Sequence, residues 1–180
     1  MEEYDDGAPP PEWVQETVQK HQGFDLRCVM SKTLEQSDLD RNQNRFLLRR
    51  EAVRANLIAA LTQREKEEAS LVNVGSKRKR MAFPGAHVER REEGDKKAAG
   101  RSHGGVDASV YIRNGWRMEL KLTQWDGSGS TVLKGREWRL LCSLAGFRRG
   151  DFVRLWMFRR QVAEREEVER QTNKLCFALG

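Results

Sequence analysis

The segment that most constrains the fold is residues 116–122, where apolar and charged side chains alternate without interruption. Trp116, Met118, Leu120 and Leu122 fall on one side of an extended chain, and Arg117, Glu119 and Lys121 fall on the other. A period of two residues is typical of a β-strand with one buried and one solvated face. The turn signal Asn114-Gly115 stands just before it and favours a hairpin. The chain is therefore predicted to contain an antiparallel sheet that packs one face on a core.

Other segments show strand or helix patterns. Strands are expected over residues 26–33, 45–48, 106–112, 131–133, 152–158 and 174–179. Helical spacing of apolar residues predicts helices over 12–22, 50–61 and 136–145, the last one ending at Gly146. The charged segment 159–173 fits either a long loop or a short exposed helix. Because no βαβ rhythm is present, the order of elements favours an all-β barrel or an α+β domain.

The apolar pattern stops between residues 76 and 105, where Gly, Ala, Lys, Arg and Glu dominate. Neither side of this segment has enough strands for a closed core of its own. We therefore interpret it as a disordered insertion within one domain rather than as a linker between two. The expected organisation is a disordered acidic leader over residues 1–10 and a single domain over residues 11–180, which is long enough to bury a core.

Charge is distributed unevenly along the chain. The net charge is −6 over residues 1–25, +5 over residues 76–101 and +6 over residues 102–160. A basic body between acidic ends points to a polyanionic partner, most often nucleic acid, with a solvated surface as the alternative. The compact cluster Lys77, Arg78, Lys79 and Arg80 predicts a binding site for a nuclear-import receptor, although such clusters also serve as phosphate tethers.

Several functional classes are disfavoured by the composition. The three cysteines, Cys28, Cys142 and Cys176, are odd in number and lack CxxC spacing, which argues against a disulfide framework or a cysteine zinc site and suits a reducing compartment. The histidines share no spacing, so no metal or other cofactor is expected. No apolar run approaches the roughly 18 residues of a membrane span. The acidic amino terminus does not resemble a secretory signal, so neither export nor membrane insertion is expected.

One pattern suggests an enzyme. Asp107, followed by Glu119 and Lys121, has the spacing of a PD-(D/E)xK nuclease, in which two carboxylates hold a metal ion and a lysine assists the attacking water. Any amphipathic strand can show the same outward Glu and Lys without catalysis. We therefore expect a protein that is not an enzyme, with a metal-dependent nuclease as a remote alternative.

A likeness to a known family appears when segments are taken in their order along the chain. They are Lys32-Thr33-Leu34-Glu35-Gln36-Ser37-Asp38-Leu39, Asn42-Gln43-Asn44-Arg45-Phe46-Leu47-Leu48, Met118-Glu119-Leu120-Lys121-Leu122 with Trp125, Val132-Leu133-Lys134-Gly135 with Trp138, Gly150-Asp151-Phe152-Val153-Arg154-Leu155-Trp156-Met157-Phe158-Arg159 and Leu175-Cys176-Phe177-Ala178-Leu179. Together they resemble the plant-specific B3 DNA-binding domain. The early Pro11-Glu12-Trp13-Val14 helix and the closing strand are especially similar to a divergent subgroup of mostly unassigned function.

The resemblance implies a mainly β fold, a seven-stranded open β-pseudobarrel with two short helices, to which this chain adds a short N-terminal helix. It also implies a nuclear transcriptional regulator that binds double-stranded DNA sequence-selectively. In that family two loop arms grip the major groove. By position, the first arm is residues 37–45 and the second is residues 124–130.

The candidates for DNA contact follow from these arms. They are Lys32 at the end of the first strand, Ser37, Arg41, Asn42, Gln43, Asn44 and Arg45 in the first arm, and Gln124, Trp125, Asp126, Ser128 and Ser130 in the second. The resemblance gives Lys32 the role of a phosphate contact. Arginine can pair bidentately with guanine, and Asn or Gln with adenine, so the first arm suits readout of base edges. Trp125 is more simply an anchor for the base of its loop.

Two positions depart from the family pattern. Arg49 stands where a proline usually closes the second strand, and Asp126 stands where an asparagine is common. An aspartate lacks the amide donor and repels phosphate. These departures leave open the alternative of a B3-like scaffold that does not bind specific DNA and acts through protein–protein contact.

Overall fold

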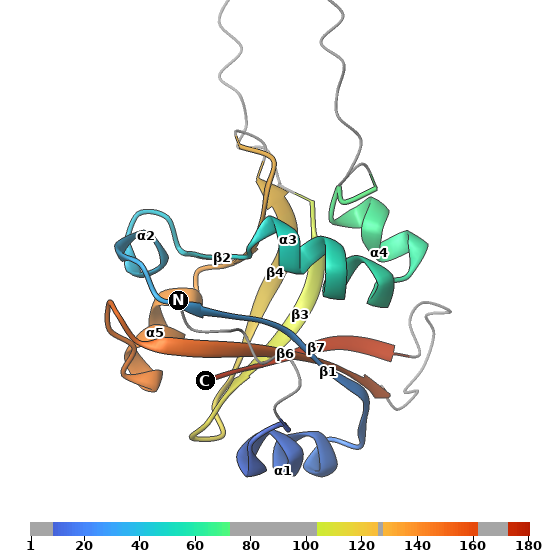
Figure 1. Ribbon diagram of the computed structural model, residues 1–180, viewed down its shortest axis with the longest axis horizontal. Helices are drawn as coiled ribbons and strands as arrows, with labels where there is room; N and C mark the ends of the chain where they lie inside the picture. Colours follow the sequence, from blue (N-terminus) through green and yellow to red (C-terminus); the bar gives the residue numbers. More distant parts are fainter. Residues whose placement is uncertain (1–8, 73–103, 126–127, 162–172) are drawn as a thin grey trace, which may run out of the picture.

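Figure 1 shows the fold in the computed structural model, which describes residues 9–72, 104–125, 128–161 and 173–180. The strands in these ranges are β1 (Gly23–Thr33), β2 (Arg45–Leu47), β3 (Val106–Ile112), β4 (Arg117–Trp125), β5 (Ser130–Lys134), β6 (Phe152–Gln161) and β7 (Asn173–Leu179). The α-helices are α1 (Glu12–Lys20), α2 (Gln36–Leu39), α3 (Arg50–Ala52), α4 (Gln63–Glu68) and α5 (Trp138–Ala145). Between α3 and α4 the backbone continues through a π-helical stretch, η1 (Val53–Leu57), and a 3-10 turn, η2 (Ile58–Ala60).

The strands form one open mixed sheet in the order β1-β6-β7-β3-β4-β5-β2. Each pairing is antiparallel except that of β3 with β7, which run parallel. β4 pairs with both β3 and β5, and β5 in turn pairs with the short strand β2. The expected mainly β fold with a seven-stranded open sheet is therefore confirmed within the described residues.

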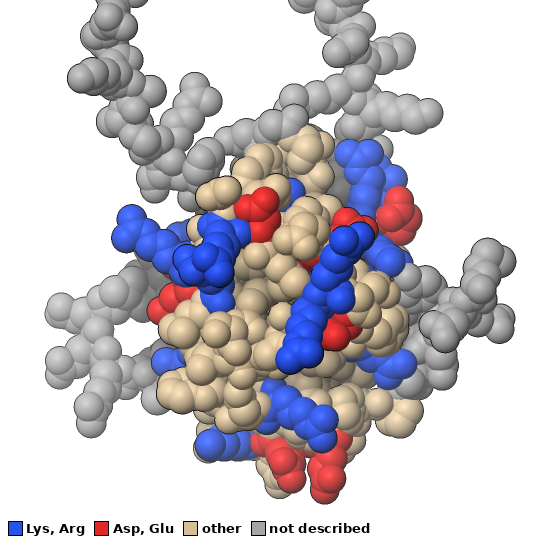
Figure 2. All heavy atoms as spheres, turned by 90° about the vertical axis from the view of Figure 1, so that its left-hand side faces the viewer, with Lys and Arg blue, Asp and Glu red and all other residues tan. Residues whose placement is uncertain are grey.

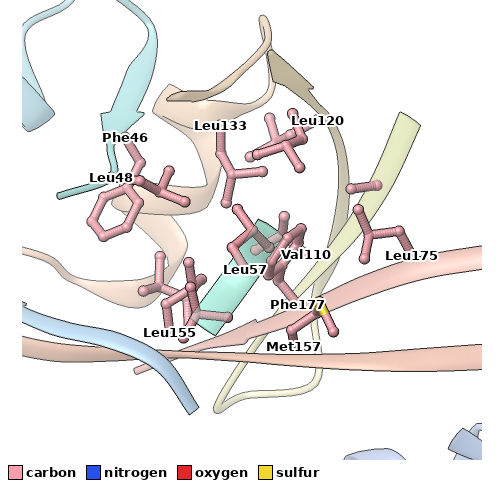
Figure 3. Packing of buried hydrophobic residues seen from close by; sticks show 14 of the residues in the cluster. Phe46, Leu48, Leu57, Val110, Leu120, Leu133, Leu155, Met157, Leu175 and Phe177 are labelled. Atoms are coloured by element: carbon pink, nitrogen blue, oxygen red, sulfur yellow. The ribbon is translucent and has the colours of Figure 1, made fainter. Parts of the chain in front are cut away.

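The main core lies between the inner face of this sheet and the helical segments η1 and α5. Figure 3 shows Leu57 of η1 among side chains from several strands, such as Val110, Leu120 and Phe177. The alternation in β4 has the predicted effect from Met118 to Leu122, where the apolar residues are buried while the charged residues between them stay exposed. Trp116 precedes the strand and is 54% exposed, so the expectation that it shares the buried side is wrong. Each large apolar side chain buried in this way contributes about 1.5–3 kcal/mol relative to an exposed one.

A second, smaller apolar cluster lies on the outer face of the sheet, under α1. Val14 of α1 is fully buried there with Tyr111 of β3 and with Trp156 and Phe158 of β6. The helix therefore covers the outer face over β3, β6 and β7. The charged residues of β4 lie on the same outer face and remain exposed.

Most predicted elements agree with the structure. The helices expected over 12–22 and 136–145 are α1 and α5, and the one expected over 50–61 is the irregular run from α3 to η2. Gly146 follows α5 with a left-handed φ of 70°, as the helix-ending glycine predicts. Helix α4 was not predicted, because none of its residues is apolar. Its sequence signal is the capping box formed by Thr62 and Glu65.

Some expectations concern parts of the chain outside the described residues. These are the leader 1–8, the import cluster Lys77–Arg80 with most of the expected insertion, Asp126, and most of segment 159–173. The disordered insertion and the single domain over 11–180 therefore stay predictions. The two described ends next to the insertion lie close to one helix: Val72 follows α4, and a Cβ atom on Gly104 would stand 3.4 Å from the carbonyl oxygen of Glu68. In the described ranges, none of the helices has the length and apolar character that crossing a membrane requires.

Candidate nucleic-acid interface

The first predicted arm is built from α2 and a tight turn that leads into β2. The Asp40 side chain accepts a hydrogen bond from the Asn42 backbone N–H at 2.7 Å, which shapes the turn. Asn44 adopts a left-handed φ of 45°, a conformation that asparagine tolerates better than most residues. Its carbonyl oxygen accepts a hydrogen bond of 3.2 Å from the Gly135 N–H, just past β5. The arm thus returns to the sheet at a defined place, with Arg41 and Asn42 exposed at its tip.

The second predicted arm is the connection from β4 to β5. The Gly129 N–H donates to the Trp125 carbonyl oxygen at 2.8 Å, and the Gln124 side chain donates to the Gly129 carbonyl oxygen at 3.1 Å. Gly129 has a φ of 65°, where glycine avoids the strain of a side chain. The Gln124 backbone N–H donates to the Ala69 carbonyl oxygen at 2.9 Å. The end of α4 therefore supports the base of this arm.

The structure brings the two arms to the edges of one groove with a volume of about 450 Å³. Its lining includes the arm residues Gln43, Asn44, Gln124 and Trp125, together with Lys121, Lys134 and Arg136 from the sheet and the turn after β5. Carboxamide groups from both arms thus line the groove together with three cations, and the carboxylates of Asp107 and Glu119 line it as well.

Two of these cations, Lys134 and Lys121, form together with Arg45, which does not line the groove, what we call the cationic row. Arg45 on β2 lies directly opposite Lys134 on β5, and Lys134 lies directly opposite Lys121 on β4. Directly opposed residues share one face of a sheet, and like charges in this arrangement are destabilising. The row ends at Asp107 on β3, whose carboxylate lies 2.9 Å from the Lys121 ammonium. The row carries a net positive charge, and two of its three cations, Lys134 and Lys121, line the groove.

Trp125 connects this row to the second arm. The Arg45 guanidinium lies 5.1 Å from the centre of the Trp125 ring, and the Lys134 ammonium lies 5.8 Å from it. Cation–π contacts of this kind contribute about 0.5–1 kcal/mol each at exposed sites. Trp125 thus packs the base of the second arm against β2 and β5. The Nε and Nη1 atoms of Arg45 are shielded from solvent and have no hydrogen-bond partner among the described residues. Reading a guanine edge would therefore require Arg45 to leave the Trp125 ring.

Of the described contact candidates, Gln43, Asn44, Gln124 and Trp125 line this groove, and Lys32 and Ser37 are among those that do not. Lys32 is only 5% exposed, and its ammonium donates to the Asp38 carboxylate at 2.9 Å and to the Leu47 carbonyl oxygen at 3.1 Å. The ammonium for which a phosphate contact is expected is thus enclosed and already paired with Asp38. Ser37 belongs to α2 and lines a different groove, of about 540 Å³, together with Arg49 and Arg149.

The remaining contact candidates of the second arm are Ser128, Ser130 and Asp126. The hydroxyls of Ser128, which is exposed, and Ser130, which is half-buried, form a hydrogen bond of 2.9 Å with each other. Asp126 lies outside the described residues.

The carboxylates of the nuclease pattern are each paired with a lysine. Asp107 pairs with Lys121, while Glu119 accepts hydrogen bonds from the Ser109 hydroxyl and the Lys174 ammonium, both at 2.7 Å. Burial raises the pKa of Glu119, but the hydrogen bonds from Lys174 and Ser109 lower it by more, so this pKa lies below its ordinary value. Within the described ranges, no group of three or more His, Cys, Asp or Glu residues could hold a metal ion.

Sequence reasoning missed Lys134 and Arg136 as groove residues and considered Lys121 only as part of a nuclease. The alternation that puts Lys121 on the outer face was visible in the sequence. The position of Lys134 opposite both Lys121 and Arg45 depends on the register of three strands, which the sequence does not specify.

Comparisons with known proteins add little to this geometry. No protein-family model matches the chain, and a search of curated proteins finds no match either. Among solved structures, the chain is similar to the Arabidopsis FUS3–DNA complex at a TM-score of 0.40 and 14% sequence identity, over 85% of this chain and 96% of that chain. A likeness this distant carries no argument about what this chain binds.

Proposed function

We propose that this protein binds double-stranded DNA sequence-selectively through the groove between its two arms, and acts as a nuclear transcriptional regulator of the B3 type without a catalytic step or a cofactor. The observation that carries the proposal is the cationic row of Arg45, Lys134 and Lys121. Like charges directly opposed across strands repel each other at a cost in stability, which the ion pair with Asp107 reduces for Lys121. A polyanion lying along the groove would offset that cost, and DNA phosphates have the matching charge.

The side chains around the row suit recognition of bases as well as phosphates. Gln43 and Asn44 come from one side of the groove and Gln124 from the other. A carboxamide carries both a donor and an acceptor and can bind an adenine edge bidentately in the major groove. To do so, Gln43 would have to expose its buried Oε1, and Gln124 would have to turn from the Gly129 carbonyl oxygen. Cations for the backbone and amides for the bases are the two kinds of contact that sequence-selective DNA binding combines.

The groove is not the only basic part of the surface. Figure 2, which faces the side of α2 and α5, shows lysine and arginine side chains in several groups, with acidic side chains among them. Positive charge alone therefore does not locate the interface. An experiment has to separate the cationic row from other exposed cations.

The test begins with selection of bound duplexes from a random pool, followed by affinity measurements at several salt concentrations. The proposal expects an enriched motif and a clear preference for it over a scrambled duplex. Lys121→Gln and Lys134→Gln should each reduce the slope of log affinity against log salt by about 0.9, the value for one lost phosphate contact. Lys20→Gln is the matched control, because this exposed lysine lies at the end of α1 and outside the groove.

Two outcomes would contradict the proposal. If no motif is enriched and neither groove variant alters the salt slope, the groove is not a DNA interface, and the scaffold for protein–protein contact becomes the better hypothesis. If the groove variants reduce the slope but every duplex binds equally, the protein binds DNA without sequence selectivity.

A further inference from the structure

Asp38 is the most enclosed charged residue of the first arm. Its carboxylate is fully buried and lies 2.8 Å from the Lys32 ammonium. The same carboxylate accepts hydrogen bonds from the backbone N–H groups of Glu35 at 3.0 Å and of Leu47 at 3.1 Å. A buried carboxylate is stable only when it is paired in this way, so the set of contacts acts as a unit.

These contacts join parts of the chain that enclose the first arm. Lys32 lies on β1, Glu35 immediately precedes α2, and Leu47 lies on β2. The Lys32 ammonium also donates to the Leu47 carbonyl oxygen, so both backbone groups of Leu47 are bound to the ion pair. In addition, the Trp138 indole N–H of α5 donates to the Asp38 carbonyl oxygen at 2.7 Å.

We infer that Lys32 and Asp38 are positioning residues that fix the first arm relative to the sheet, and that Lys32 does not contact phosphate. This inference rests on the proposed DNA-binding function for its consequence, but the positioning itself can be measured without DNA. The Lys32 ammonium has three donor hydrogens, and its position leaves only 5% of the residue exposed. An ammonium moved out to a phosphate would leave the Asp38 carboxylate buried without its charge partner.

The consequence for function is preorganisation. The chain leaves the sheet at the end of β1, next to Lys32, and returns in β2, which contains Leu47, so that one ion pair holds both sides of the arm. An arm that is already ordered loses less conformational entropy when it binds than a loose one does. Loosening it should weaken binding to the preferred site, where side chains must meet base edges, more than binding to random duplex.

The first experiment measures backbone hydrogen exchange in the free protein. In Lys32→Met and in Asp38→Asn, the amides of Glu35 and Leu47 should exchange about tenfold to a hundredfold faster, the loss expected for a hydrogen bond to a charged group. The amide of Phe177, in the middle of β7, should keep its protection and so serves as the internal control for folding. Unchanged exchange at Glu35 and Leu47 in both variants would overturn the inference.

The second experiment measures affinity for selected and random duplexes against salt. A positioning role predicts that Lys32→Met and Asp38→Asn lose affinity for the selected duplex by similar factors and leave the salt slope unchanged. The double variant should lose little more than either single variant, because the two residues act together. Arg41→Gln is the positive control: this exposed arginine of the same arm should lower the slope by about 0.9 if it contacts one phosphate.

The outcomes separate this inference from the proposed function. If Lys32→Met lowers the slope by about 0.9 while Asp38→Asn does not, Lys32 is a phosphate contact and the inference is wrong. If the wild type binds no duplex, the proposed function fails, and the exchange data still decide whether the ion pair fixes the arm. If Lys32→Met fails to fold, as loss of Phe177 protection would show, Asp38→Asn and the uncharged double variant provide the same comparison.

Discussion

Replacing Arg159 with methionine should lower the free energy of unfolding by about 3–5 kcal/mol, the cost of breaking a buried ion pair from one side. The side chains of Arg159 and Glu65 are 8% and 4% exposed. Arg159 Nη2 donates to the Glu65 carboxylate and to the Ala60 carbonyl oxygen, both at 2.7 Å, while Nη1 donates to the other Glu65 oxygen. Methionine keeps most of the apolar stem, so the loss reports mainly on the charge and its hydrogen bonds.

Glu65 would keep only part of its contacts in that variant. The Thr62 backbone N–H would still donate to its carboxylate, now at 2.8 Å, but no cation would face it. Glu65→Gln should cost a similar amount by leaving Arg159 without its counter-ion. The double variant Arg159→Met with Glu65→Gln should cost less than the sum of the single variants, because no buried charge is left unpaired.

The assay is urea unfolding followed by fluorescence, with the slope against urea checked for constancy. Arg64→Ala is the matched control, since it breaks the exposed Arg64–Glu68 pair on the same helix, which is worth about 0.3–0.5 kcal/mol. A loss of less than about 1 kcal/mol in Arg159→Met would refute the prediction, because the Arg159–Glu65 pair would then contribute no more than a surface ion pair.

The pair also has a predicted acid dependence. Burial raises the pKa of Glu65, but the hydrogen bonds from Arg159 and Thr62 lower it more, so the pKa lies below its ordinary value. The contribution of Glu65 to stability is therefore present above the unfolded-state pKa of about 4.3 and is lost as the pH falls through the folded-state pKa. This part of the acid-induced loss should be absent in Glu65→Gln.

Three further predictions concern other regions. Burial lowers the pKa of His21, and Arg160, Lys20 and Arg117 lower it further. The folded state thus favours neutral His21, and the free energy of unfolding should fall as the pH drops below the unfolded-state pKa of about 6.5. Between pH 7.5 and pH 5.5, urea unfolding should show a smaller fall in this free energy for His21→Gln than for the wild type. An equal fall in both would contradict this prediction. Trp125→Leu should lower the free energy of unfolding by about 1–2 kcal/mol through loss of both cation–π contacts, and Trp125→Phe should lower it by less. Equal free energies of unfolding for the two variants would show that these contacts add nothing to stability. Alanine at Lys77, Arg78, Lys79 and Arg80 together should abolish nuclear accumulation of a fusion too large to diffuse through the pore, and retained accumulation would exclude the cluster as the import signal.

The sequence predicted those features that depend on local pattern. The alternation of Met118, Leu120 and Leu122 with charged residues was enough to identify β4 and its buried face, because a strand repeats every two residues. The ion pair of Lys32 and Asp38 could not be predicted in this way. Charged residues are rarely buried, and nothing local distinguishes these two from a polar loop until β1, α2, β2 and α5 pack together.

The two arms also show where the place of a residue in the family's sequence pattern differs from its place in the structure. Gln43, Asn44 and Gln124 line one groove, because the pairing of β2 with β5 and of β5 with β4 brings the loops together. Lys32 has the expected place in the sequence, yet it points into the protein. Whether a lysine at a strand end faces solvent depends on which acid lies beside it in the fold, and that acid is Asp38.

Helix α4 is where the chain leaves the described fold after Val72, and Gly104 lies against it where the chain returns. Two ends that both lie at α4 can be joined by segments of very different length at little cost, since each doubling of a loop costs only about 0.6 kcal/mol in closure entropy. Lengthening or shortening the chain between Val72 and Gly104 should therefore leave the stability of the sheet almost unchanged.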